Sequence, residues 1–223
     1  FIVYCLLSSA SYLINDIVDA PLDRKHPQKK DRPIASGDLK PKQAVLVAVG
    51  LIVIGLLIAG LALSLTFLLL VVVYVLIHLV YSFFLKKLPI LDIFGISVSF
   101  IFRALGGEAA TGFHLPVWLM FTVVFLSLFI ASGKRRSELV LQGDKTRPAL
   151  GKYRKSLLNF YLSLFSVSTL LSYSLFAYLV QPARFGEATR LQRFLIESYP
   201  RLANRKWLML TIFPVILGIM RYS

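Results

Sequence analysis

Three aspartates, Asp16, Asp19 and Asp23, follow the first apolar run of the chain at spacings of three and four residues. In a helix these spacings place the carboxylates on one face. There they repel one another unless a divalent cation or an equivalent positive charge lies between them. A hard metal held by oxygens, with lysine and arginine close behind, is what a pyrophosphate requires. The alternative is a solvated helix end, but carboxylates at a helix C-terminus oppose the dipole.

The helix that carries these residues is expected to end among them. Pro21 disfavours further regular helix because its ring clashes with the carbonyl four residues back. We therefore expect Asp23 to lie past a kink. The apolar piece at 1–14 is too short to span a membrane.

A basic segment follows the aspartates and ends in RPIASG at 32–37. On its own, such a segment after a span is more often a topology signal than a site. Beside three carboxylates, it fits an anionic substrate equally well. Arg32 is favoured because a guanidinium can engage phosphate oxygens in a bidentate manner. The cations of the segment are Arg24, Lys25, Lys29, Lys30 and Arg32.

A second polar cluster, YSFFLKKLPILD at 81–92, is followed by Arg103 inside an apolar run. Lys86 and Lys87 in this cluster serve topology or substrate binding. A guanidinium at membrane depth must face the bundle interior, a cavity or a partner. Either Asp92 or a substrate phosphate could pair with Arg103, and Glu108 could equally serve a surface group.

A third cluster, GKRRSE at 133–138, lies at the end of another apolar run. Lys134 and Glu138 are four residues apart and could form an ordinary helical ion pair. The cations, including Arg135, also suit a lipid phosphate at the point where a helix leaves the membrane. His78 is interpreted as a packed or hydrogen-bonded histidine, and the single cysteine, Cys5, as a small packed hydrophobe.

The composition identifies a polytopic membrane protein. Hydrophobic residues make up 57% of the chain and the mean hydropathy is +0.73, well above the usage of soluble domains. About 20 apolar residues are needed to span a bilayer, and little sequence remains for a soluble domain. Spans are predicted at 43–62, 66–84, 92–111, 115–133, 156–180 and 207–220.

The charge of the chain points to a membrane orientation and an anionic substrate rather than to nucleic acid. The formal net charge is +14, and the segments 21–42, 85–91 and 134–155 hold seven, two and eight of the 25 lysines and arginines. These segments alternate with connections that carry no cation, so the positive-inside rule places them, and the aspartates, in the cytoplasm. The 181–206 connection departs from this pattern and is predicted to include a surface amphipathic helix.

Taken together, several motifs resemble the UbiA superfamily of intramembrane transferases. They are NDxxDxxxD at 15–23, HP at 26–27, RPIASG at 32–37, YSxxLK at 81–86 and FxxRALGG at 102–107. The resemblance implies an all-α transmembrane bundle of about nine spans in a bacterial-type plasma membrane, with a Mg²⁺-dependent diphosphate site at its cytoplasmic mouth. Seven or eight spans would be represented in a single transferase domain, 1–223. One helix before Phe1 and one near the C-terminus would then lie outside the chain.

The loop at 133–139 departs from most of that superfamily, which has a second aspartate motif there. GKRRSEL instead resembles the branch that makes polyprenyl-phosphate phosphoribose. This resemblance implies transfer of 5-phosphoribose from phosphoribosyl pyrophosphate to a decaprenyl-type polyprenyl phosphate, with release of pyrophosphate. The product would lead toward lipid-linked arabinose or ribose donors for cell-wall polysaccharide.

The resemblance also assigns roles to individual residues. Mg²⁺ would be held by Asp16 and Asp19, assisted by Asn15 and Asp23. The catalytic set would be these two aspartates with Lys30, Arg32 and Lys86. Substrate-binding residues would be Asn15, Asp23, Lys29, Tyr81, Arg103, Lys134, Arg135 and Glu138.

Two other functions remain open at this point. One is a prenyltransferase of the same superfamily, moving an isoprenoid from its diphosphate to an aromatic acceptor. The other is a membrane carrier or lipid-binding protein without chemistry. Oligomeric state is also open, with a homo-oligomer among the alternatives.

Overall fold

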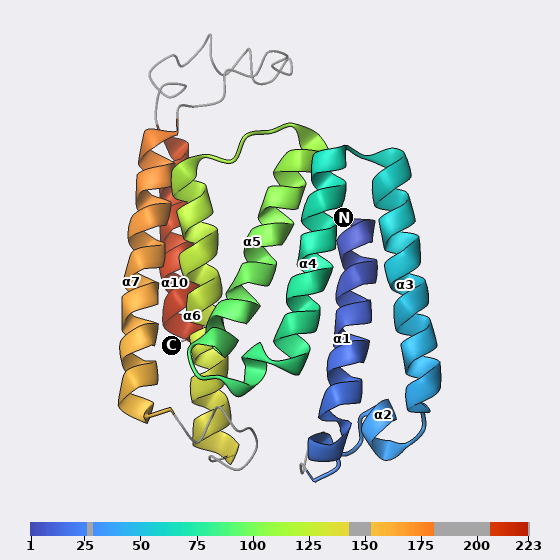
Figure 1. Cartoon of the computed structure of the whole chain (residues 1–223). Coiled ribbons are helices and arrows are strands. Elements are labelled where there is room, and N and C mark those ends of the chain that lie inside the picture. The colour runs from blue at the N-terminus through green and yellow to red at the C-terminus, as the bar shows by residue number, and fades with distance from the viewer. Residues whose placement is uncertain (26–28, 143–152, 181–205, 223) are drawn as a thin grey trace.

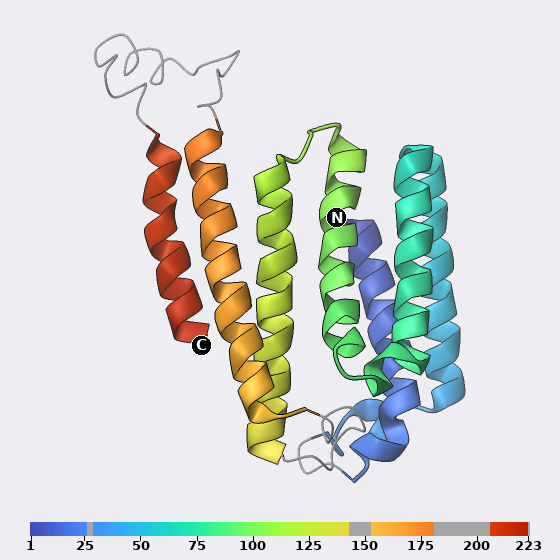
Figure 2. The ribbon, with the colours of Figure 1, turned by 60° about the vertical axis from the view of Figure 1, so that its left-hand side comes forward.

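The protein is a bundle of membrane-length helices (Figures 1 and 2). The computed structural model describes residues 1–25, 29–142, 153–180 and 206–222. Six helices in these ranges are long and apolar enough to cross a membrane, and the described elements are all helical. They are α1 (Ile2–Asp23), α2 (Pro33–Ser36), α3 (Pro41–Ala62), α4 (Leu65–Phe83), η1 (Leu85–Lys87), α5 (Leu91–Thr111), α6 (Val117–Gln142), α7 (Lys155–Leu179), η4 (Trp207–Thr211) and α10 (Ile212–Tyr222).

The helices follow one another around the bundle. Helix α1 packs between α3 and α4, α5 between α4 and α6, and α6 against α7, whose other neighbour is the short α10 (Figure 2). Large apolar side chains such as Leu46, Leu61 and Leu69 are exposed on the outside, as expected for a surface that meets lipid. The all-α membrane bundle predicted from the sequence is confirmed.

Small residues let α1 and α3 approach closely. The buried residues of α3 are Ala44, Ala48, Gly55 and Ala59. A Cβ atom added to Gly55 would lie 3.0 Å from Leu7 Cδ2 on α1. Helices in lipid associate through such close packing because the bilayer supplies no hydrophobic drive between them.

The first predicted boundary was wrong. Helix α1 has 22 residues and is a candidate span, although 1–14 alone is too short. It continues through Pro21 to Asp23, which is therefore still part of the helix. Pro21 is tolerated because it removes one hydrogen bond in the last turn, where Arg24 N–H still reaches Ala20 O.

The last predicted span is only partly a regular α-helix in the described structure. Residues 207–220 form the five-residue 3₁₀ turn η4 followed by α10, an 11-residue helix. Together they stay below the length of a span. Pro214 has no N–H and lies in the first turn of α10, where N–H groups have no partner within the helix, so the helix tolerates it. The predicted amphipathic helix in 181–206 lies outside the described residues except for Lys206.

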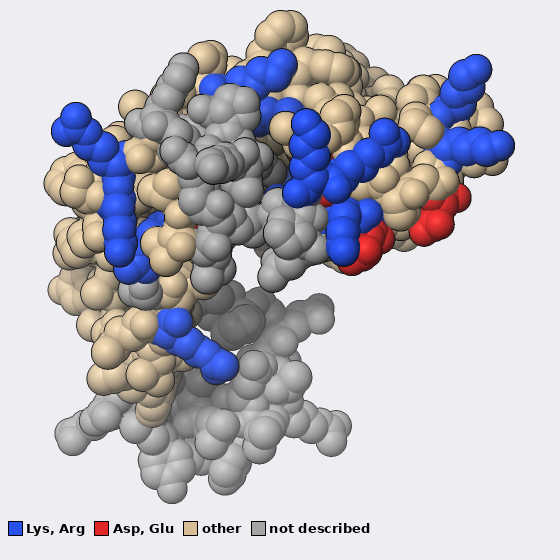
Figure 3. Space-filling model, turned by 90° about the horizontal axis from the view of Figure 1, so that it is seen from below, with Lys and Arg blue, Asp and Glu red and all other residues tan. Residues whose placement is uncertain are grey.

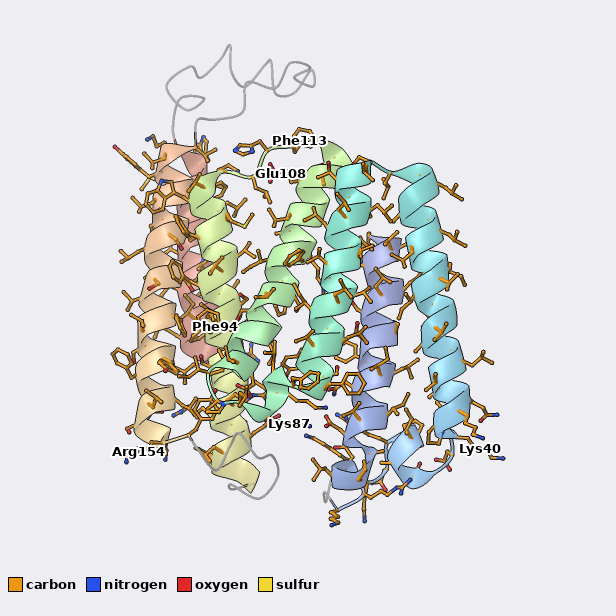
Figure 4. All side chains as sticks on the ribbon, viewed as in Figure 1. Lys40, Lys87, Phe94, Glu108, Phe113 and Arg154 are labelled. Atoms are coloured by element: carbon orange, nitrogen blue, oxygen red, sulfur yellow. The ribbon has the colours of Figure 1, made fainter. Side chains whose placement is uncertain are left out.

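The charged connections meet at one end of the bundle, as predicted. Helix α2, η1 and the adjoining ends of α6 and α7 lie at the lower end in Figure 1. Seen from that end, lysine and arginine side chains gather over the surface (Figure 3). Lys40, Lys87 and Arg154 lie there, whereas Glu108 and Phe113 lie at the opposite end (Figure 4). This arrangement brings the three polar clusters of the sequence to one side.

Candidate active site

The aspartates at the end of α1 are paired with cations from two other elements. Arg32 Nη1 donates to Asp16 Oδ1 at 2.6 Å and to Asp23 Oδ2 at 3.0 Å. Arg32 is the residue before α2, whose Pro33 starts the helix and whose end is set by Gly37 at φ 97°. This compact turn folds the basic segment back onto α1.

Asp19 is paired from the connection between α4 and α5. Lys86 Nζ donates to Asp19 Oδ1 at 2.6 Å and to Asn15 Oδ1 at 3.1 Å. Asn15 Nδ2 donates to Asp19 Oδ2 at 3.1 Å. Lys86 is only 6% exposed and Asp19 8% exposed. Because both charges are largely removed from water, each depends on the other for compensation.

The predicted magnesium ligands lie along the C-terminal part of α1, but their side chains diverge. Asp16 and Asp23 face Arg32, and Asp19 faces Lys86. In the part of the chain that the structure describes, no three His, Cys, Asp or Glu side chains converge on a metal position. Mg²⁺ commonly takes one or two carboxylates and completes its shell with water and substrate phosphates. The carboxylate oxygens of Asp16 and Asp19 fit that pattern of ligation.

A second charged cluster lies deep between α5, α6 and the segment before α7. Arg135 is 1% exposed and Asp92 is fully buried, and Arg135 Nε faces Asp92 Oδ2 in an ion pair. Arg135 Nη1 also donates to Glu138 Oε2 at 2.6 Å, and Nη2 to Tyr81 at 3.1 Å. Two carboxylates and a phenol therefore hold this guanidinium in place.

Tyr153 completes this cluster and was missed by the sequence analysis. Its hydroxyl donates to Asp92 Oδ1 at 2.9 Å and accepts a hydrogen bond from the N–H of Ile90. Ile90 has φ 69°, an uncommon conformation for a non-glycine residue. Burial, together with the negative charge of Asp92, raises the pKa of Tyr153, so the phenol remains a donor. A tyrosine on the charged side, next to an apolar run, was the available signal.

Arg103 does not pair with Asp92, contrary to one of the two predicted alternatives. It donates through Nη2 to Ser8 Oγ at 2.9 Å and to the Tyr74 hydroxyl at 3.1 Å. Glu108 lies 2.7 Å from the exposed ring of His114 and serves a surface contact. Asp92 is unavailable to Arg103 because Arg135 and Tyr153 occupy it.

A cavity of about 210 Å³ joins the clusters between α1, α4, α5 and α6. Its walls at the charged end include Asn15, Tyr81, Lys134 and Arg135, and its inner walls include Arg103. Five predicted site residues thus share one cavity. Asp16, Asp23 and Arg32 are joined by their ion pairs at the end of α1. Lys30 is exposed and Lys29 half-buried in the segment before Arg32.

Comparison with known proteins agrees with this architecture. Residues 1–189 match the model of the UbiA prenyltransferase family, and the chain belongs to that family. It is an integral membrane protein of a family of transferases. A UbiA homolog from Archaeoglobus fulgidus, bound to DMAPP and Mg²⁺, superposes with a TM-score of 0.70 over the whole chain and 86% of that structure. At 14% identity, this likeness shows the fold alone.

Two relatives are more similar in sequence. The chain is 34% identical to decaprenyl-phosphate phosphoribosyltransferase from Corynebacterium glutamicum over its full length and 63% of the relative. It is 33% identical to the enzyme of the same name from Mycolicibacterium smegmatis, again over its full length and 67% of the relative. The chain thus spans about two thirds of the length of these relatives.

Proposed function

We propose that this protein transfers 5-phosphoribose from phosphoribosyl pyrophosphate to a polyprenyl phosphate, with release of pyrophosphate. The observation that carries the proposal is that Lys134 and Arg135 of α6 line the same cavity as Asn15 of α1. A reaction between a diphosphate and a phosphate monoester needs two anion sites that face each other. The acidic turn of α1 suits the first through a metal, and the basic turn of α6 suits the second directly.

The end of α1 would bind the pyrophosphate of the donor. Asp16 and Asp19, with Asn15 and Asp23 assisting, would hold Mg²⁺, which neutralises charge on the departing pyrophosphate when bound. Arg32 and Lys86 already lie within 3.0 Å of these carboxylates. From there, and with Lys29 and Lys30 of the same basic segment, they can contact phosphate oxygens while remaining near the acids.

The end of α6 would position the acceptor. Lys134 is exposed and lines the cavity, so its ammonium can contact a phosphate at the membrane surface. Arg135 is enclosed by Asp92, Glu138 and Tyr81 and orients this turn. It is better described as a positioning residue than as the main phosphate ligand.

The transfer then needs little acid–base chemistry. An oxygen of the lipid phosphate forms a bond to the anomeric carbon of ribose while the bond from that carbon to pyrophosphate breaks. A phosphate monoester is already anionic near neutral pH, so no general base has to remove a proton. Catalysis would come from positioning and from charge stabilisation of the leaving group.

The proposal includes the setting of the reaction. Residues 1–223 would form one transferase domain, with the charged end in the cytoplasm, where the water-soluble donor is available. The lipid product would supply pentose for a cell-wall polysaccharide. Names of the relatives support the substrate class, and the segregation of cations supports the orientation.

The test compares two pairs of substrates with the purified protein in detergent. We expect pyrophosphate release and a phosphoribosylated lipid from labelled phosphoribosyl pyrophosphate plus decaprenyl phosphate. Turnover only with prenyl diphosphates and aromatic acids would identify a prenyltransferase instead. Binding or uptake without product in either assay would identify a carrier. Asp16→Asn, which removes one proposed metal ligand, is the matched variant and should have impaired activity.

A further inference from the structure

Arg103 lies deep in the bundle without a carboxylate partner. It is the thirteenth residue of α5, which begins at Leu91 at the charged end, so at 1.5 Å per residue its Cα lies about 18 Å along the helix. Its hydrogen-bond partners, Ser8 and Tyr74, are neutral. Within the described ranges it forms no salt bridge. A guanidinium at this depth is costly unless an anion compensates it.

Two nitrogen atoms at this place, one of them in the guanidinium itself, have no hydrogen-bond partner in the described part of the chain. They are Arg103 Nε and His78 Nε2, both buried. His78 packs on Tyr74 with ring centroids 4.4 Å apart, and Arg103 lies over the same tyrosine ring, 5.8 Å from its centroid. A buried polar nitrogen that lacks a partner is destabilising. Arg103 Nε always carries a proton, so it requires an acceptor, which a ligand at this place would supply.

Both residues line the cavity that opens toward Asn15. Serine hydroxyls add polarity to its inner walls. Ser11 and Ser99 each donate to a carbonyl of their own helix, which leaves oxygen lone pairs available to accept. From Asn15 to Ser8 the rise along α1 is about 10 Å, so the cavity can hold a group that extends inward from the aspartates.

We propose that the inner end of this cavity is a second phosphate site, in which Arg103 binds a phosphate monoester. The assignment rests on the proposed function, in which both substrates carry such a group. The 5-phosphate of the donor can reach inward from a pyrophosphate bound at Asp19, with the ribose along the serines. The lipid acceptor is the other source of the same chemistry. His78 and Tyr74 position the guanidinium from α4.

The experiment measures binding separately from turnover, by calorimetric titration of the purified protein. The three probes are ribose 5-phosphate, geranyl phosphate, and inorganic pyrophosphate with Mg²⁺. We expect Arg103→Met to weaken ribose 5-phosphate at least tenfold and to leave pyrophosphate unchanged. Arg221→Met, on the exposed end of α10, is the matched control and should change none of the three.

Each outcome decides the proposal. A loss confined to geranyl phosphate would keep the site and assign it to the lipid. Unchanged binding of both monoesters, or no binding of either by the parent protein, would overturn it and leave a cavity that holds water. If Arg103→Met does not fold, Tyr74→Phe, which removes one hydroxyl beside the guanidinium, should weaken the same probe by a smaller factor. Absence of phosphoribosyl transfer with intact ribose 5-phosphate binding would sink only the proposed function.

Discussion

Lys86 Nζ lies 2.6 Å from Asp19 Oδ1, although 67 residues separate them in the chain. The contact ties the connection between α4 and α5 to the acidic turn of α1. The same connection continues to Ile90 and Asp92, which Tyr153 and Arg135 hold from the other side. One short segment is therefore in contact with both charged clusters of the site.

Loss of Lys86 should be costly. Lys86→Met leaves the carboxylate of Asp19 buried without its ammonium, and breaking a buried pair in this way costs about 3–5 kcal/mol. Thermal unfolding in detergent should show this loss. Lys87→Met is the matched control because Lys87 is exposed, and should shift unfolding little. Equal melting temperatures for Lys86→Met and Lys87→Met would contradict the role of the pair. Lys86→Met/Asp19→Asn should recover stability without activity.

Tyr153→Phe should loosen the connection before α5. The change removes a donor to buried Asp92 and an acceptor for Ile90 N–H, and unsatisfied buried groups cost about 1–3 kcal/mol each. We expect lower stability together with a lower kcat, since Asp92, which pairs with Arg135, is no longer held by the Tyr153 hydroxyl. Tyr161→Phe on α7, with no hydrogen bond from its hydroxyl in the described structure, is the control. Wild-type thermal unfolding and kcat in Tyr153→Phe would show that Tyr153 does not hold the connection before α5.

Arg32→Met should weaken binding of the donor and should also lower stability. The Arg32 side chain is 38% exposed and that of Asp16 30%, so their ion pair contributes at most about 1 kcal/mol. Asp23 is buried and loses the same partner. The Arg32 guanidinium lies where phosphate oxygens would meet Asp16 and Asp23. Steady-state kinetics should show a raised KM for phosphoribosyl pyrophosphate and an unchanged KM for the lipid. Lys40→Met, at the exposed start of α3, should change neither; a rise in the lipid KM instead would reverse our assignment of the two anion sites.

Removal of divalent cations should stop turnover without unfolding the protein. Each carboxylate of α1 already has Arg32 or Lys86 beside it within the protein, so the fold should not require a metal. Chelation by EDTA should abolish product formation, and added Mg²⁺ should restore it. Asp16→Asn should raise the Mg²⁺ concentration needed for half-maximal rate. A large fall in melting temperature on chelation would show that the metal is structural.

From the sequence, the residues that gather at the charged end of the bundle could be predicted better than the pairing of the buried charges. The aspartates and the basic segment could be placed together because spans and positive charge order the loops. The partner of each buried charge could not be predicted, because it depends on the rotation of helices far apart in the chain. For this reason Asp92 was predicted as a possible partner of Arg103, whereas packing of α5 against α6 pairs it with Arg135. Tyr153 stood in no recognised motif.

The small side chains along α3 have a consequence for where the acids lie. Leu7 packs against the backbone of Gly55. Asp16 lies nine positions after Leu7 along α1, a rise of about 13.5 Å. This contact fixes the position of α1 along α3, because α1 cannot slide without moving Leu7 away from Gly55. The position of the carboxylates relative to α3 is thus set by helix packing.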